Sequence, residues 1–157
     1  MEENNVVEDT DANREGDDDY VNLNPKATPD EVRLGTFLHR RALAGDLPGV
    51  RTVAGAPEVP GQRSGDYRFV LHDGRVVSVD LYQPESTNTR SIAMHIMQKS
   101  GQAMVIVIEL GRRRSGHIGD EEATHMVQEI LATPGHTINR IMVIRDEMII
   151  VDTSQAI

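Results

Sequence analysis

The sequence predicts an α+β domain, a central mixed β-sheet flanked by helices, in the order α-β-β-α-β-α-β-β. Residues 65–84 (GDYRFVLHDGRVVSVDLYQP) form two alternating segments around a turn at His72-Asp73-Gly74, which indicates a β-hairpin. Residues 102–110 (QAMVIVIEL) form a near-continuous apolar run, typical of a central strand buried on both faces. Helical periodicity appears before, between and after these strands.

The charge of the chain is concentrated at its N-terminal end. Residues 2–19 contain nine acidic residues against Arg14, and so hold nearly all of the net charge of −9. Such a segment is too polar and too charged to form a core, so we expect residues 1–24 to be a disordered acidic leader and residues 25–157 to be one domain. Because the rest is almost neutral, its charge does not exclude a nucleic-acid partner. There is no apolar run of membrane-spanning length, and no cysteine.

The first helix is predicted from about Asp30 to Ala44. Thr28 at the N-cap, Pro29 in the first position and Glu31 in the third form a capping box. Arg40 and Arg41 near its end make this region basic, which suits contact with phosphates and equally an ordinary helix surface.

The remaining elements follow from pattern. The Gly- and Pro-rich residues 45–65 predict a loop with a short edge strand near 49–53, and helices are predicted at about 89–100 and 120–133. A second hairpin is predicted over residues 138–152. Arg112, Arg113 and Arg114, just after the central strand, form the densest basic cluster, which is compatible with phosphate binding or with a solvated loop.

The register of the first hairpin follows from its apolar residues. A three-residue loop with Gly74 in the left-handed conformation pairs Tyr67 with Val79 and Phe69 with Val77. This register gathers the apolar side chains on one face, whereas a two-residue loop would mix apolar and charged residues on each face.

The same register sets Asp66 directly opposite Asp80. Opposed like charges destabilise a strand pair, so two carboxylates held in this way favour a cation between them. One interpretation is a divalent-metal site, since Mg²⁺ binds one or two carboxylates together with water and phosphate. The alternatives are that Arg68 neutralises the pair, or that both lie at a splayed, solvated end of the hairpin.

Taken together, these motifs resemble the C-terminal tRNase domain of contact-dependent growth inhibition (CdiA-type) toxins, a branch of the PD-(D/E)xK nuclease-like fold. The matching residues occur in the family's order: Asp66-Tyr67, Gly74-Arg75, Asp80-Leu81-Tyr82-Gln83-Pro84, Lys99-Ser100-Gly101-Gln102 and the apolar strand from Ala103 to Leu110. The resemblance covers about the last 90 residues and, more loosely, the first helix. The chain departs from the family in lacking a proline before Asp66.

The resemblance implies a metal-dependent endoribonuclease. Asp66 and Asp80 would bind one Mg²⁺ or Mn²⁺ ion, Glu31 would be a third carboxylate, and Lys99 would orient the attacking water or stabilise charge on the phosphate. Glu109 is the replacement if Glu31 is not the third acid. It also implies a tRNA substrate, a cognate immunity protein, and action in the cytoplasm of a target bacterium after delivery as the end of a larger secreted protein.

Three other functions are to be considered. Six histidines are present, and a metal-free ribonuclease would use histidine as acid and base, but no pair has the i, i+4 spacing of helix ligands. A nuclease-like fold can also serve as a non-catalytic module that binds RNA or protein. An immunity or antitoxin protein would fit the acidic leader but leaves the paired aspartates unexplained.

Overall fold

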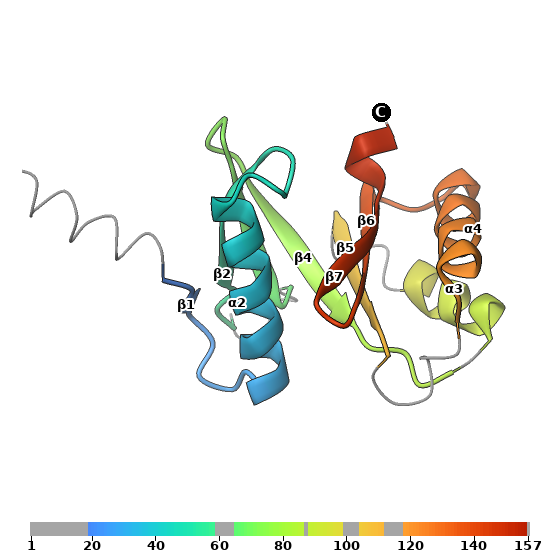
Figure 1. Ribbon diagram of the computed structural model, residues 1–157, viewed down its shortest axis with the longest axis horizontal. Coiled ribbons are helices and arrows are strands. Elements are labelled where there is room, and N and C mark those ends of the chain that lie inside the picture. Colours follow the sequence, from blue (N-terminus) through green and yellow to red (C-terminus); the bar gives the residue numbers. More distant parts are fainter. Residues whose placement is uncertain (1–18, 59–64, 87, 99–103, 112–117, 157) are drawn as a thin grey trace, which may run out of the picture.

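The computed structural model describes residues 19–58, 65–86, 88–98, 104–111 and 118–156. In it, a seven-stranded sheet lies between helix α2 on one face and helices α3 and α4 on the other (Figure 1). None of the helices in these described ranges is long and apolar enough to cross a membrane. The elements are β1 (Val21–Asn22), α2 (Pro29–Leu43), β2 (Val50–Gly55), β3 (Tyr67–Leu71), β4 (Val76–Tyr82), α3 (Thr89–Gln98), β5 (Val105–Leu110), α4 (Asp120–Ala132), β6 (Arg140–Arg145), β7 (Met148–Asp152) and the 3₁₀ turn η2 (Thr153–Ala156).

The sheet is mixed, and its strands follow one another in chain order. The central strands β4, β5 and β6 are parallel, and β2–β3, β3–β4 and β6–β7 are antiparallel. The predicted α+β class is therefore confirmed. The segment expected as a short edge strand is the six-residue β2, which lies inside the sheet because β1 pairs with its outer edge.

Strand β1 lies within the residues predicted as leader. It is only two residues long, too short to leave a periodic pattern. The ring of Tyr20 lies against Gly35 on α2 and close to Gly55 on β2, where an added Cβ would come within 2.3 Å and 2.8 Å of tyrosine atoms. Most of the predicted leader, residues 1–18, lies outside the described residues.

The first hairpin has the predicted register. Tyr67 pairs with Val79, Phe69 pairs with Val77, and the amide of Leu71 donates to the carbonyl of Arg75 at 2.8 Å. Gly74 has φ +92°, the left-handed conformation that the three-residue loop requires. The second hairpin is also confirmed, with the turn at Asp146 and Glu147 between β6 and β7.

Two apolar cores lie on opposite faces of the sheet. Val105 and Val107 of β5 pack with Leu34 and Leu38 of α2, whereas the alternating residues of β5 pack with α3 and α4. This arrangement explains why the β5 sequence is apolar at successive positions, since all six of its residues are buried.

Helix α2 begins as predicted. The Thr28 hydroxyl accepts from the amide of Glu31 at 3.1 Å, and the Glu31 carboxylate accepts from the amide of Thr28 at 2.8 Å. Helices α3 and α4 also lie where the periodicity predicts them. The capping box fixes the first turn of α2, and with it the backbone position of Glu31.

Candidate active site

Asp66 lies directly before the first residue of β3, at a point where the partner strand β4 continues. Its carboxylate accepts a hydrogen bond from the backbone amide of Leu81 at 2.8 Å, in place of the backbone carbonyl that a longer β3 would supply. Because strand amides point toward the neighbouring strand, this bond holds the Asp66 carboxylate near the plane of the sheet. Asp66 is therefore beside Asp80, which precedes Leu81 on β4.

Asp80 lies on the face of the sheet that α3 and α4 cover. It is in register with Ile106 of the core on that face, whereas its neighbours Val79 and Leu81 belong to the core beneath α2. Its exposed fraction is only 7%. A buried carboxylate beside a second one is an arrangement often found at functional sites.

Glu31 approaches Asp66 from the other face. Besides closing the capping box, its side chain raises the pKa of Asp66 through hydrogen bonding and charge. Tyr67 fixes the same helical turn to the sheet, because its hydroxyl donates to the Glu31 carbonyl at 2.7 Å. Asp66 thus lies between two other predicted carboxylates: Glu31 acts on it from α2, and the charge of Asp80 acts on it from β4.

The electrostatics of Asp66 reflect this convergence. Burial raises its pKa to about 6, the Leu81 amide opposes the rise, and the hydrogen bond with Glu31 and the charges of Glu31 and Asp80 add to it. Burial also raises the pKa of Tyr20 to about 12, with further contributions from Glu31 and Asp66. The carboxylates at this point repel one another, and a bound cation would relieve that repulsion.

The donor set fits a divalent ion that keeps several water ligands. Within the described ranges, no group of three or more histidine, cysteine, aspartate or glutamate side chains is placed so that it could hold a metal ion. Mg²⁺ does not need such a group, since it is usually held by one or two carboxylates, water and substrate phosphate. Asp66 and Asp80 are the two carboxylates that would supply such oxygen ligands.

Of the cationic residues discussed from the sequence in this part of the chain, only Arg68 lies within the described residues. Arg68 is exposed on β3. Lys99 follows directly after Gln98 in the sequence and lies outside the described residues. Arg112, Arg113 and Arg114 also lie outside them.

Arg40 and Arg41 lie at the end of α2 remote from Glu31. Nine residues of helix separate Glu31 from Arg40, about 13 Å along the axis. Arg40 is exposed, and Arg41 forms an ion pair with Asp46. If they bind nucleic acid, they contact a part of it away from the carboxylates.

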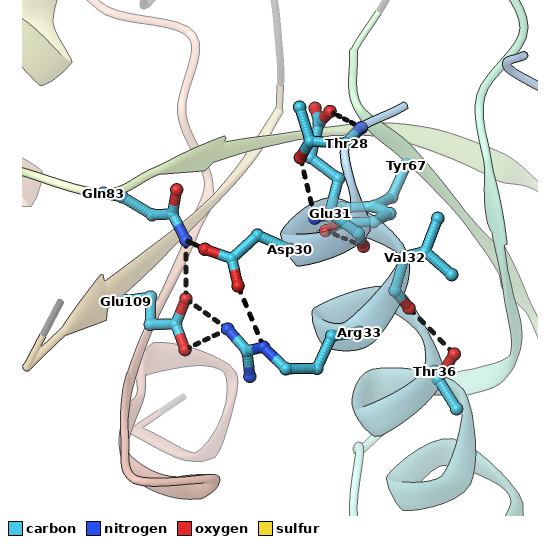
Figure 2. A network of polar contacts seen from close by, with 9 residues as sticks. All are labelled: Thr28, Asp30, Glu31, Val32, Arg33, Thr36, Tyr67, Gln83 and Glu109. Atoms are coloured by element: carbon cyan, nitrogen blue, oxygen red, sulfur yellow. Dashed lines mark hydrogen bonds and ion pairs between the residues drawn. The ribbon is translucent and has the colours of Figure 1, made fainter. Parts of the chain in front are cut away.

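A second polar network, which the sequence did not reveal, lies beside these carboxylates (Figure 2). Arg33 donates to both oxygens of Glu109, at 2.9 and 2.8 Å, and to Asp30 at 3.0 Å. The Gln83 amide donates to Asp30 at 2.9 Å and to Glu109 at 2.8 Å. Glu109, the alternative third acid, is therefore engaged with Arg33 and Gln83, and Glu31 is the acid that contacts Asp66.

Three of the histidines have separate environments in the described part of the chain. His39 is buried and accepts from the amide of Val53 at 3.1 Å, and His125 pairs with Glu129 on the surface of α4. His95 stacks on Tyr82, with ring centroids 5.9 Å apart.

Gly65 is required by close contact between backbones. A Cβ at this position would lie 2.6 Å from the carbonyl oxygen of Val79 and 3.0 Å from its nitrogen. Proline also carries a Cβ, so this contact explains why a proline does not precede Asp66.

We expect Gly65→Ala to lower the free energy of unfolding by about 1–3 kcal/mol, the usual cost of overpacking. It should also weaken the Asp66–Leu81 hydrogen bond, seen as faster exchange of the Leu81 amide. Gly74→Ala is the matched control: an added Cβ there meets nothing within 4 Å, and only its positive φ is strained. It should lower stability without affecting the Leu81 amide; equal exchange in both variants would contradict the role of Gly65.

The comparisons with known proteins give one similarity. No protein-family model matches the sequence, and no curated protein matches it. Among solved structures, the chain is similar to one described as "CdiA-CT/CdiI toxin and immunity complex from Burkholderia pseudomallei", at 25% sequence identity and a TM-score of 0.49. The match covers 82% of this chain and 89% of that chain. The activity of this protein therefore has to be inferred from its own side chains.

Proposed function

We propose that this protein is a divalent-metal-dependent endoribonuclease, the toxin domain of a contact-dependent growth inhibition protein. The observation that carries the proposal is the position of the half-buried Asp66, on which the charges of Glu31 and Asp80 both act. The order of motifs from Asp66 to Leu110 supports it. The further proposals are that its substrate is tRNA in the cytoplasm of a target bacterium and that an immunity protein neutralises it.

Asp66 and Asp80 would hold the ion, with Glu31 as the third carboxylate. When bound, Mg²⁺ or Mn²⁺ supplies a water of lowered pKa and a Lewis acid at the phosphoryl oxygen. The Leu81 amide holds one carboxylate oxygen of Asp66, and the Thr28 amide of the capping box holds one of Glu31. These bonds limit the rotation of both side chains. We assign Lys99 the role of orienting the attacking water or stabilising negative charge on the phosphate.

The alternative of a non-catalytic binding module predicts that Arg68 bridges the aspartates. Arg68 is exposed, and the charges of Glu31 and Asp80 act on Asp66. The raised pKa of Asp66 supports the nuclease proposal, because a bound cation would offset these like charges.

The test is incubation of the purified protein with total tRNA, with and without Mg²⁺ or Mn²⁺, beside an Asp80→Ala variant. We expect cleavage that needs the metal and is lost in the variant. Asp46→Ala is a suitable control, because Asp46 is exposed and pairs with Arg41 away from the carboxylates. Intact tRNA and DNA in every reaction would refute the nuclease, and cleavage that survives EDTA would implicate the histidines.

A further inference from the structure

A cavity of about 540 Å³ lies between the end of β4 and α3. Its volume is within the roughly 300–1,000 Å³ typical of sites for small organic groups. The residues that line it are Tyr82, Gln83, Glu85, Ser86, Ser91 and His95. It therefore combines two aromatic rings with polar groups that can form hydrogen bonds.

The two rings form a stacking platform. Tyr82 and His95 are stacked at a centroid distance of 5.9 Å with 19° between their planes. The Tyr82 side chain is partly buried against the core on the α3 and α4 face, whereas His95 is exposed. A rigid, inner ring and an accessible, outer ring suit a planar ligand, because flat π-systems stack with little loss of side-chain freedom.

The cavity adjoins the candidate metal site. Asp80 and Tyr82 are two residues apart on β4 and so point to the same face of the sheet. Their separation along the strand is about 6.6 Å. A nucleotide whose phosphate lies at Asp80 can therefore place its base at Tyr82.

Gln83 supplies a hydrogen-bond acceptor of fixed orientation. Both of its amide contacts are with carboxylates, Asp30 and Glu109, so the NH₂ group must face them. Figure 2 shows its carbonyl oxygen directed away from both. Within the described residues, that oxygen has no hydrogen-bond partner, and it is free to accept from a ligand.

We propose that this cavity is a nucleobase subsite, in which one unpaired base of the RNA substrate stacks on the Tyr82–His95 pair. This inference rests on the proposed ribonuclease function, and it defines the substrate near the cut as single-stranded. Base–aromatic stacking tolerates any base sequence and needs an unstacked nucleotide, as in an RNA loop or end.

The first experiment detects the subsite without any cleavage. Histidine ring protons of the full chain are followed by NMR while cytidine or adenosine 5′-monophosphate is added, and the His95 signal is assigned from its loss in His95→Gln. We expect that signal to move with either nucleotide and to stay in place with ribose 5-phosphate, which has no base. His125, exposed on α4, is the internal control and should not move.

The second experiment uses RNA oligonucleotides in which one ribose at a time lacks its base. Tyr82→Ala and His95→Ala should each lower kcat/KM on intact RNA about 10- to 100-fold, as expected for loss of base stacking. Each variant should equal the wild type on RNA that is abasic at the stacked position. His95→Ala keeps the test valid if Tyr82→Ala fails to fold, since His95 is exposed.

The outcomes separate the two proposals. A moving His95 signal without cleavage of any RNA would support the subsite and refute the nuclease. Normal cleavage by both variants, with an unmoved His95 signal, would refute the subsite and leave the nuclease intact. Equal losses on intact and abasic RNA would mean that the rings act on the fold and would also refute the subsite.

Discussion

Asp66→Asn is expected to abolish cleavage and, at the same time, to stabilise the metal-free protein at neutral pH. Cleavage should fall by about a hundredfold or more, because a catalytic metal contributes several kcal/mol and each 1.36 kcal/mol is a factor of ten. Stability should rise because Asn keeps an oxygen for the Leu81 amide but removes a charge that Glu31 and Asp80 repel.

The pH dependence fixes the sign of this effect. Burial and the neighbouring carboxylates raise the pKa of Asp66 from 3.8 to about 6 in the folded protein, so the folded state binds its proton more tightly than the unfolded state does. The resulting stabilisation is fully present below pH 3.8 and is lost as the pH rises through about 6. At neutral pH the charged group then destabilises the fold by about 1–2 kcal/mol, after allowance for its partial exposure to solvent.

Urea denaturation of both proteins between pH 4 and 8 in EDTA, and again with Mg²⁺, measures this effect. The variant should be the more stable protein above pH 6 in EDTA, and only the wild type should gain stability from Mg²⁺. Asp73→Asn is the control of opposite sign: the Arg75 amide and guanidinium lower the pKa of that exposed carboxyl. It should not stabilise the protein at neutral pH or affect cleavage. A less stable Asp66→Asn protein in EDTA would contradict the proposed repulsion.

The sequence was sufficient to predict the hairpin and the position of Asp80. A strand pattern has a period of two, and a buried face tolerates one register only, so Tyr67 and Val79 had to pair. The same logic placed Asp80 on the face opposite to Val79. The capping box of α2 could also be predicted, because its bonds join residues only three positions apart.

Contacts between distant segments could not be predicted in this way. Arg33 and Glu109 are 76 positions apart, and the sequence pattern around each is that of an ordinary helix surface and an apolar strand. The bond from the Leu81 amide to Asp66 depends on where β3 begins, which periodicity does not fix. The stacking of Tyr82 on His95 depends on how α3 packs against β4, and one apolar stripe allows several rotations of a helix.

Arg33→Met is expected to lower the free energy of unfolding by about 3 kcal/mol. Glu109 has an exposed fraction of only 3%, and this substitution removes a cation that contacts both of its oxygens. Breaking a buried ion pair costs about 3–5 kcal/mol, and the partial exposure of Arg33 places it at the lower end. Adding Glu109→Gln should restore most of the loss, because a neutral amide needs no cation.

Arg41→Met is the matched control on the same helix. Its ion pair with Asp46 is exposed on both sides, so the change should cost at most about 1 kcal/mol. Denaturation with urea compares Arg33→Met, Arg33→Met/Glu109→Gln and Arg41→Met with the wild type. Equal losses of stability for Arg33→Met and Arg41→Met, or no rescue by Glu109→Gln, would show that Arg33 does not stabilise the buried charge of Glu109.

Arg33→Met should also reduce cleavage of tRNA. Arg33 is not expected to take part in the reaction, and its effect would come from the position that it gives to Glu31. The Arg33 network joins Asp30, on the first turn of α2, to Gln83, just beyond β4 (Figure 2). Asp30 is next to Glu31 in the sequence, and Gln83 lies three positions after Asp80. Loosening this link lets Glu31 move relative to Asp66, so metal affinity should fall more than maximal rate. The double variant Arg33→Met/Glu109→Gln then separates the two effects: it should regain stability while its metal affinity stays low, because the link from α2 to β5 through Arg33 is still missing.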